Sequence, residues 1–455
     1  MEQSLQTGLM RIGTLVPDPK ASAKGSCWML GCETLDRDFA DFQQYKEYIP
    51  ALGIPLIRLQ AGWAKTEKVQ GQYDFEWLDR IVDDAMSLGL KCLLETDYGN
   101  PIYEGGGGTD LASGFPTSET ALAAWDAWVA ALTIHFRDRV NDWAMWNEPD
   151  IKQGVIPQDV AKFNVRTAAT IRKFQPDARI AGLSLAFPDT NWFYYCLKTL
   201  QELGAEEWFD SYIYHGYKYN PDDASDDGLR LIALMKRMGI RPRLRQGENG
   251  CPSELTEKFA LNHYPWTELT QAKWDLRRYI GDFGAGVPSS VFTICDFNHI
   301  GRQINRKGLL LADEQHHVIR PKLVYWAIRN MTTLFNDGLE VIPGGCVARS
   351  ATRLQAFAMR RKTDQAYQVV FWDRSGIPGE GDFTGKADLL VHGFRLKDPV
   401  VIDPLSGAVY AFPQGQACDC AGRTLYLDVP CGDSPLVLAD RTMIGLVENN
   451  STSKQ

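Results

Sequence analysis

Two rhythms of apolar and polar residues alternate along the chain between about residues 25 and 335. Some segments, such as the one with Leu78, Ile81, Val82 and Ala85, carry apolar residues three and four positions apart, which is typical of a helix with one buried face. Short apolar runs separate these segments and predict eight strands, at residues 27–32, 54–60, 91–97, 142–148, 179–185, 211–217, 241–248 and 290–297. Strands that alternate with helices predict a parallel sheet, and eight such units predict an α/β fold closed into a (β/α)8 TIM barrel.

A doubly wound open sheet is the rival α/β fold. It requires a glycine-rich phosphate loop after its first strand, but here the first strand continues into "GCETLDRDF". The "EGGGG" at residues 104–108 follows the third strand and lacks the Lys-Ser/Thr pair of a P-loop. The barrel is therefore the favoured interpretation, and this glycine-rich segment is expected to form a loop at its mouth.

The pattern changes after about residue 335, where short runs rich in β-formers are separated by Gly, Pro and Asp. Leu425, Leu427 and Val429 alternate with polar neighbours, as one face of a half-buried strand does. We therefore expect a barrel domain at residues 25–335 and a smaller all-β sandwich at residues 336–445. The segment 1–24, which contains "LMRIGTLV", is expected to add a strand to the sandwich, and the tail 446–455 to be disordered.

Charge and cysteine usage narrow the range of partners. The net charge of −9 and the pI of about 5.4 offer no basic surface for nucleic acid or an anionic membrane. The chain has no run of 18 apolar residues and no apolar stretch of signal-peptide type near its start, so a cytoplasmic protein is expected. None of the ten cysteines forms a Cys-x-x-Cys pair and the seven histidines do not cluster, so we expect reduced thiols, no metal and no cofactor.

Two predicted strands each deliver a glutamate from an apolar run to the same end of the barrel. Glu148 ends the fourth strand in "DWAMWNEPD", directly after Asn147, and Glu248 ends the seventh in "RLRQGENG". The carboxyl ends of barrel strands carry the chemistry of this fold. Two carboxyl groups that face each other across a cleft are the machinery of glycoside hydrolysis, one as acid and the other as nucleophile or base.

The neighbours of the two glutamates suit opposite protonation states. Trp143 and Trp146 supply an apolar wall that raises the pKa of a nearby carboxylic acid, as a proton donor requires. Arg58 is a charge inside the apolar run "IPLIRLQ", and if it points into the barrel it keeps Glu248 ionised.

The sixth strand and the residue before Glu148 add further polar groups. His215 and Tyr217 lie two residues apart in "YHGY" and so share one face of the strand. The tyrosine hydroxyl can hydrogen-bond the nucleophile, and the histidine can orient the site or bind a sugar hydroxyl. Asn147 has both a donor and an acceptor, which suits a hydroxyl next to the reacting carbon.

Trp-Asn-Glu-Pro at the end of strand four, with a second glutamate at the end of strand seven, resembles the retaining glycoside hydrolases of clan A. The resemblance covers the barrel, and the added β-sandwich is similar to the layout of the β-xylosidases and their relatives in glycoside hydrolase family 39. It implies that Glu148 is the acid/base, Glu248 the nucleophile and Asn147 the contact to the 2-hydroxyl. It also matches three supporting residues of the clan: Arg58, His215 and Tyr217.

The eighth strand departs from the clan pattern, because it lacks the tryptophan that usually forms the floor of the sugar site. In "FTICDFNHIG" either Phe297 takes this place, or Asp296, Asn298 and His299 form a more polar floor. Other polar and aromatic residues near strand ends or in expected mouth loops are candidate sugar contacts: Glu33, Asp36, Trp63, Asp97, Tyr98, Tyr103 and Trp266. Glu33 and Asp36 could equally cap the helix that follows them.

These observations predict a retaining β-glycosidase that acts on a carbohydrate, from the chain end of small oligosaccharides or glycosides. The two carboxyl groups should then lie about 5–5.5 Å apart. A carbohydrate-binding barrel without turnover, and a transglycosidase that uses the same two glutamates, stay open. An aldolase would need a lysine near a strand end, where Lys91 is the candidate, and a metal hydrolase a His/Asp cluster. The sequence does not determine whether the protein forms a homo-oligomer.

Overall fold

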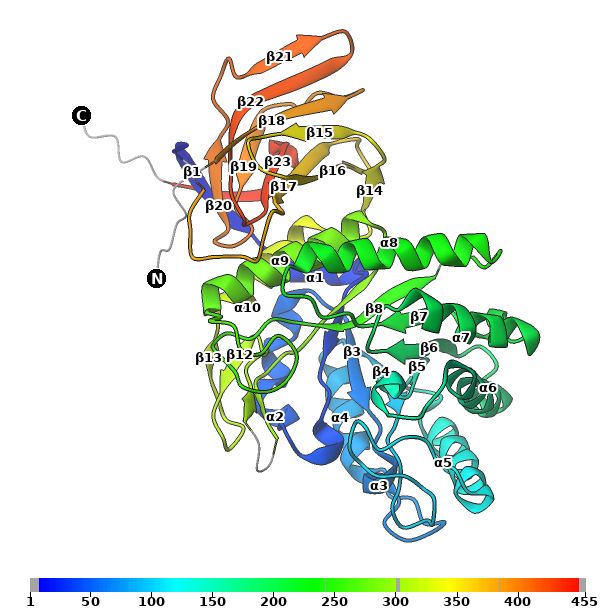
Figure 1. Cartoon of the computed structure of the whole chain (residues 1–455). Helices are drawn as coiled ribbons and strands as arrows, with labels where there is room; N and C mark the ends of the chain where they lie inside the picture. The colour runs from blue at the N-terminus through cyan, green and yellow to red at the C-terminus, as the bar shows by residue number, and fades with distance from the viewer. Residues whose placement is uncertain (1–7, 242, 300–302, 384, 450–455) are drawn as a thin grey trace.

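The computed structural model of the chain describes residues 8–241, 243–299, 303–383 and 385–449. Eight parallel strands close into a barrel in the order of the sequence, so the predicted fold is confirmed (Figure 1). Each lies within one of the eight apolar runs or within one residue of it. The strands are β2 (Met29–Gly31), β3 (Leu56–Gln60), β4 (Lys91–Thr96), β5 (Asp142–Met145), β6 (Arg179–Leu185), β7 (Ser211–Tyr214), β8 (Leu244–Asn249) and β9 (Ser289–Val291).

Helices surround the barrel and begin at residues whose side chains cap them. Ser118 accepts from the amide of Ala121, and Asp189 accepts from the amides of Asn191 and Trp192. The long helices are α4 (Glu76–Ser87), α5 (Glu119–Phe136), α6 (Pro157–Phe174), α7 (Thr190–Glu202), α8 (Pro221–Arg237), α9 (Glu268–Gly284) and α10 (Leu323–Leu334). Shorter helices are α1 (Pro19–Lys24), α2 (Phe42–Tyr45) and α3 (Trp63–Thr66). Among the described residues, no helix combines the length and the apolar character needed to cross a membrane.

The inside of the barrel changes from apolar to polar along the strands β4 and β7. Met29, Leu93, Ala144, Ala181 and Ile213 form a small apolar cluster of their own within the barrel. Since alternate residues of a strand face the same side, the residues two positions further on share this inward direction and lie closer to the mouth. Those residues include Glu95 on β4 and His215 after β7. The strand period therefore places charged groups above an apolar base.

A domain of antiparallel sheets follows the barrel, and Figure 1 shows it packed on one side of the barrel beyond α8, α9 and α10. An eight-stranded sheet has the order β14-β16-β17-β23-β19-β20-β1-β24, and a four-stranded sheet the order β15-β18-β22-β21. The strands of the larger sheet are β1 (Arg11–Val16), β14 (Leu339–Ile342), β16 (Leu354–Arg361), β17 (Tyr367–Asp373), β19 (Pro399–Ile402), β20 (Ala408–Ala411), β23 (Leu436–Asp440) and β24 (Gly445–Glu448). Those of the smaller sheet are β15 (Cys346–Arg349), β18 (Gly385–His392), β21 (Ala417–Cys420) and β22 (Arg423–Cys431).

Both ends of the described chain enter the larger sheet. β1 pairs with β20 on one side and with β24 on the other. The expectation of a disordered tail from residue 446 is wrong for residues 446–448, because their amide and carbonyl groups pair with β1, which would otherwise leave an open edge. The remainder of the expected tail, from residue 450, lies outside the described residues.

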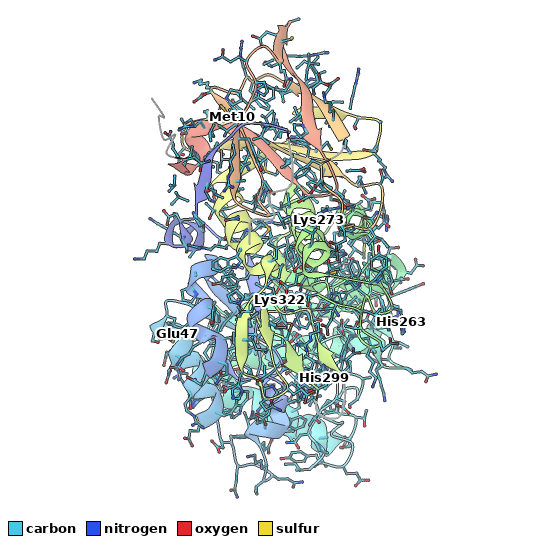
Figure 2. The ribbon with its side chains drawn as sticks, turned by 90° about the vertical axis from the view of Figure 1, so that its left-hand side faces the viewer. Met10, Glu47, His263, Lys273, His299 and Lys322 are labelled. Atoms are coloured by element: carbon cyan, nitrogen blue, oxygen red, sulfur yellow. The ribbon has the colours of Figure 1, made fainter. Side chains whose placement is uncertain are left out.

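Buried polar groups join the two domains. The ammonium of Lys273, labelled on α9 in Figure 2, donates to the carbonyl oxygens of Gly379 and Gly381 at 2.8 and 2.6 Å and to Asp433 at 2.8 Å. These three acceptors belong to loops of the β-domain. The bonds satisfy a cation that is fully buried in the barrel wall, so the contact between the domains is part of the folded core.

Replacing Lys273 with Met is expected to lower the free energy of unfolding by about 2–3 kcal/mol, because Asp433 and the two carbonyl groups lose a charged donor. Urea unfolding followed by tryptophan fluorescence measures the change. The control is Lys198→Met, which removes an exposed ion pair with Glu202 and should change stability by less than about 1 kcal/mol. Equal stability of the two variants would show that the contact between the domains contributes little.

Candidate active site

The guanidinium of Arg58, on β3, is buried at the mouth of the barrel and contacts four side chains at once. Its Nη1 donates to Glu33 Oε1 at 2.9 Å and to Glu248 Oε2 at 3.0 Å. Its Nη2 donates to Glu95 Oε2 and to Asn147 Oδ1, both at 2.7 Å. Because the guanidinium is planar and its donors are fixed in direction, these four groups are held in one arrangement.

Glu248, on β8, lies in surroundings that favour its ionised form. Burial opposes ionisation, but the charges of His215 and Arg58 and the hydrogen bonds from Arg58 and Tyr217 prevail, so the pKa of Glu248 is below its usual value. The Tyr217 hydroxyl donates to Oε1 at 2.9 Å, and Arg58 donates to Oε2. Both carboxylate oxygens therefore accept a hydrogen bond, as a negative group kept in a buried site requires.

Glu148 lies in surroundings with the opposite effect. It follows β5 in a left-handed conformation (φ 48°), and its amide donates to the carbonyl oxygen of Ser184 at 2.9 Å. Burial raises the pKa of its carboxyl group, and the charge of Glu248 raises it further, against a hydrogen bond with His215. His215 Nδ1 lies 2.8 Å from Oε1 of Glu148. This glutamate thus holds a proton to higher pH than an exposed glutamate does.

The two glutamates face each other at close range. A carboxylate oxygen of Glu148, a ring nitrogen of His215 and a carboxylate oxygen of Glu248 all lie within 4.8 Å of one another. This limit is below the roughly 6.5–9.5 Å separation of the carboxyl groups in inverting glycosidases and agrees with the roughly 5–5.5 Å of retaining ones.

Asn147 is oriented by a chain of hydrogen bonds that runs across three strands. Its amide nitrogen donates to the hydroxyl oxygen of Tyr98 at 2.9 Å, and the Gln60 amide donates to the same oxygen at 3.1 Å. Its carbonyl oxygen accepts from Arg58. The predicted site residues Asn147, Tyr98 and Arg58 are thus brought together, and Gln60 is added to them.

Additional carboxyl groups surround the centre. Glu33 bonds Arg58 through one oxygen, and its Oε2 has no hydrogen-bond partner among the described residues. Burial raises the pKa of Glu33 to about 8, against the charge of Arg58. Burial, together with the charge of Glu95, also raises the pKa of Asp97 well above its usual value. Asp36 is paired with Arg37, so it lies beside the centre without joining it.

The residues after the eighth strand do not form the polar floor that was one of the two expectations. Asp296 is fully buried and is bonded to Lys322, Arg306 and the Gly308 amide, so its carboxylate is occupied by protein donors. The side chain of Asn298 donates to the carbonyl oxygen of Glu314. Phe297 lies instead in an aromatic group, with its ring centroid 5.8 Å from Phe292 and 5.1 Å from His299.

Three aromatic residues expected at the mouth are part of the interior. Trp63 is fully buried in α3 and packs against Trp125, Trp128 and Tyr103. Tyr103 donates its hydroxyl to Glu67. Trp266 is 3% exposed and donates its indole N–H to the carbonyl oxygen of Leu261. The expectation that Trp63 and Trp266 are sugar-stacking walls is wrong, because their rings are enclosed by protein, whereas Tyr103 is 8% exposed and its role as a sugar contact stays a prediction.

Two charged residues close to the centre were not predicted from the sequence. Glu95 lies two residues after the inward-facing Leu93, so it faces the inside of the barrel as well. This alternation of side chains along the strand is the signal that could have identified Glu95 from the sequence. Lys307 lies in the segment that follows β11 (Ile304–Asn305), which has no periodic pattern. Lys91, the lysine considered for an aldolase, begins β4 and is exposed at the opposite end of the barrel.

The atoms of Glu148, His215 and Glu248 within 4.8 Å of one another are also of the kind that bind zinc. In this site the donors of Arg58 and Tyr217 already occupy both oxygens of Glu248, and His215 is bonded to Glu148. The Arg58 guanidinium also repels a second cation at this position. This donor set does not suit a metal ion, and the expectation of a metal-free site stays a prediction.

Comparisons with known proteins agree with this fold. A family model described as β-galactosidase matches residues 37–101. β-Galactosidase BgaA from Clostridium cellulovorans is 34% identical over 68 residues, which cover 14% of this chain and 10% of BgaA. The matching segment thus spans about a tenth of this curated relative and includes β3 and β4 of the barrel.

Solved structures resemble the whole chain. A family 39 glycoside hydrolase from Bacteroides cellulosilyticus WH2 has a TM-score of 0.66 at 16% identity, over 92% of this chain and 82% of that one. A monomeric β-xylosidase from Caulobacter crescentus CB15 has a TM-score of 0.57 at 15% identity, over 94% and 97%. The catalytic domain of family 30 xylanase C from Talaromyces cellulolyticus has a TM-score of 0.56 at 12% identity, over 96% of this chain and 98% of that one. The fold, a barrel with an added β-domain, is that of these glycoside hydrolases.

Replacing Arg58 with Met is expected to lower the free energy of unfolding by about 3–5 kcal/mol, because the buried carboxyl groups of Glu33, Glu95 and Glu248 then lose the charged donor that they share. Thermal and urea unfolding at pH 7 measure the change. Arg166→Met is the matched control, since it removes an exposed pair with Asp126 and should change stability by about 0–1 kcal/mol. A variant of Arg58 as stable as this control would contradict the central position of the guanidinium.

Proposed function

We propose that the protein is a retaining β-glycosidase that cleaves O-glycosidic bonds by double displacement. The observation that carries the proposal is the pair Glu148 and Glu248, whose oxygens lie within 4.8 Å while their surroundings shift their pKa values in opposite directions. Two carboxyl groups with separated pKa values are the acid and the nucleophile that this chemistry needs. The likeness in fold to family 39 and family 30 glycoside hydrolases supports the same class.

In the first step the ionised carboxylate of Glu248 attacks the anomeric carbon, and Glu148 gives its proton to the departing oxygen. The bond from the sugar to the leaving group breaks as the ester bond to Glu248 forms. Asn147, fixed by Arg58 and Tyr98, is positioned to bond a hydroxyl next to the reacting carbon. Such bonds act on the transition state without further reorganisation.

In the second step Glu148 acts as a base. Once Glu248 is an ester, it no longer carries the negative charge that raises the pKa of Glu148. The pKa of Glu148 therefore falls in the glycosyl-enzyme, so that its carboxylate can take a proton from the attacking water. The water releases the sugar with its original configuration, and both glutamates return to their starting states.

The proposed substrates are small β-linked oligosaccharides or glycosides cleaved from the chain end. The two glutamates are only 7% and 9% exposed, which favours a narrow pocket that admits one terminal sugar over an open cleft. Because the similar proteins include a β-xylosidase and a β-galactosidase, the first panel of substrates to be assayed contains both β-pentosides and β-hexosides.

Azide rescue of alanine variants tests the two roles with a panel of activated aryl β-glycosides. Glu248→Ala is expected to lose at least about 10⁴-fold in kcat and to form an α-glycosyl azide, because azide replaces the missing nucleophile. Glu148→Ala should form a β-glycosyl azide, because azide attacks the intact glycosyl-enzyme. NMR of the products distinguishes the anomers. A β-glycosyl azide from Glu248→Ala and an α-glycosyl azide from Glu148→Ala would reverse the two catalytic roles. If the wild type cleaved none of the glycosides, the proposal would be contradicted.

Replacing Tyr217 with Phe tests how Glu248 is kept ionised. The tyrosine hydroxyl lowers the pKa of Glu248, so its loss raises that pKa and moves the acid limb of kcat/KM to higher pH. We expect kcat/KM at the optimum to fall roughly tenfold. Tyr219→Phe is the control, since that hydroxyl bonds the carbonyl oxygen of Asn262 and does not contact either glutamate. An unmoved acid limb in Tyr217→Phe would contradict the role of this bond.

A further inference from the structure

Lys307 differs from the other lysines and arginines that are at most 2% exposed in the described part of the chain. There are six such side chains, and five of them contact a carboxylate: Arg58, Lys273, Arg277, Arg278 and Lys322. Lys307 is 2% exposed, yet its ammonium forms no ion pair with a described residue. Burying an ammonium without a counter-ion lowers the stability of the fold, and an anionic ligand beside Lys307 would offset this cost.

The ammonium of Lys307 lies beside the nucleophile. Nζ is 5.7 Å from the centroid of the Tyr217 ring, and the hydroxyl of that ring donates to Glu248. On another side, Nζ is 6.0 Å from the centroid of Phe259. Burial lowers the pKa of Lys307 to about 8, against the attraction of Cys251, Glu248 and Asp275. Two aromatic rings thus lie beside this cation, and one of them carries the hydroxyl that bonds the active-site carboxylate.

The other ionisable groups named here are either paired or held in their neutral form. Arg306, the preceding residue, bonds Glu254 and Asp296. Asp275 accepts a hydrogen bond from the Cys251 amide, and burial raises its pKa well above the usual value, which disfavours its charged form. Arg58 is engaged by four side chains and has little capacity left for a ligand. Among these groups Lys307 is the cation that can accept an anionic partner.

We propose that Lys307 binds a negatively charged substituent on the sugar whose anomeric carbon meets Glu248, so that the substrate is an anionic glycoside. The inference rests on the proposed glycosidase function and specifies its substrate class. The anionic group is either the carboxylate of a uronic acid or a sulfate ester, since both accept hydrogen bonds from an ammonium. The rings of Phe259 and Tyr217 lie close to the ammonium, and a charge-assisted bond is stronger in such low-dielectric surroundings than in water.

Matched pairs of aryl β-glycosides test the proposal, because the two members differ only in the charged group. The pairs are glucuronide with glucoside, galacturonide with galactoside, and galactoside 6-sulfate with galactoside. For at least one pair, the wild type should cleave the anionic member with a kcat/KM roughly 10- to 100-fold above that of the neutral one. The pair that shows the preference distinguishes a carboxylate from a sulfate.

Substitutions at Lys307 then show whether this cation causes the preference. Lys307→Met should lower the ratio of anionic to neutral kcat/KM by roughly 10- to 100-fold, mainly through KM of the anionic member. Lys307→Arg keeps the charge and should retain most of the ratio. Lys258→Met, which removes an exposed lysine next to Phe259, is the control for net charge and should leave the ratio unchanged.

Three outcomes would overturn the inference. The first is a wild type that prefers the neutral member of every pair, which contradicts it while leaving the glycosidase function intact. The second is an equal loss on both members in Lys307→Met, which would mean that Lys307 only supports Tyr217. If no glycoside is cleaved, calorimetry with sodium glucuronate, sodium galacturonate and galactose 6-sulfate replaces the kinetic assay. If one of these compounds binds and Lys307→Met weakens its binding, the inference is supported. The third outcome that overturns the inference is that the protein binds none of these compounds.

Discussion

The buried guanidinium of Arg58 is the group on which the arrangement of the barrel mouth depends. It lies inside the ring of strands and bonds Glu33 after β2, Glu95 on β4, Asn147 after β5 and Glu248 on β8. These acceptors come from both sides of the barrel, so one cation fixes the distance across it. Several carboxyl groups can be buried together because they share this charged donor, and removing it would leave the oxygens that it bonds without a partner.

Arg58 also contributes to the different protonation states of the two catalytic candidates. Arg58 contacts Glu248 and does not contact Glu148, so its charge favours ionisation of the first while burial keeps the proton on the second. His215 lies between the two, with Nδ1 2.8 Å from Glu148 and 3.9 Å from Glu248. The difference in protonation therefore arises because the charges of His215 and Arg58 and the hydrogen bonds from Arg58 and Tyr217 outweigh burial at Glu248, whereas burial and the charge of Glu248 prevail at Glu148.

Periodicity determined how much could be predicted from the sequence. The eight strands and the positions of Glu148 and Glu248 were predictable, because barrel strands are apolar runs and their carboxyl ends converge. Trp63 was misplaced because its loop folds back as α3, and no local pattern distinguishes a buried loop tryptophan from an exposed one. Lys307 was not predicted because it lies in a connecting segment without a periodic pattern, and its burial results from tertiary packing.

Covalent trapping tests the central claim most directly. The protein would be incubated with activated 2-deoxy-2-fluoro β-glycosides of the sugars that it cleaves, since the fluorine slows hydrolysis of the glycosyl-enzyme, and its peptides would be mapped by mass spectrometry. The account predicts one added sugar on the peptide that contains Glu248. It also predicts a much slower reaction in Arg58→Lys, because a single ammonium cannot hold Glu33, Glu95, Asn147 and Glu248 in the arrangement that the planar guanidinium fixes. A label on Glu148 or Glu33, or cleavage of the parent glycosides without any label, would contradict it.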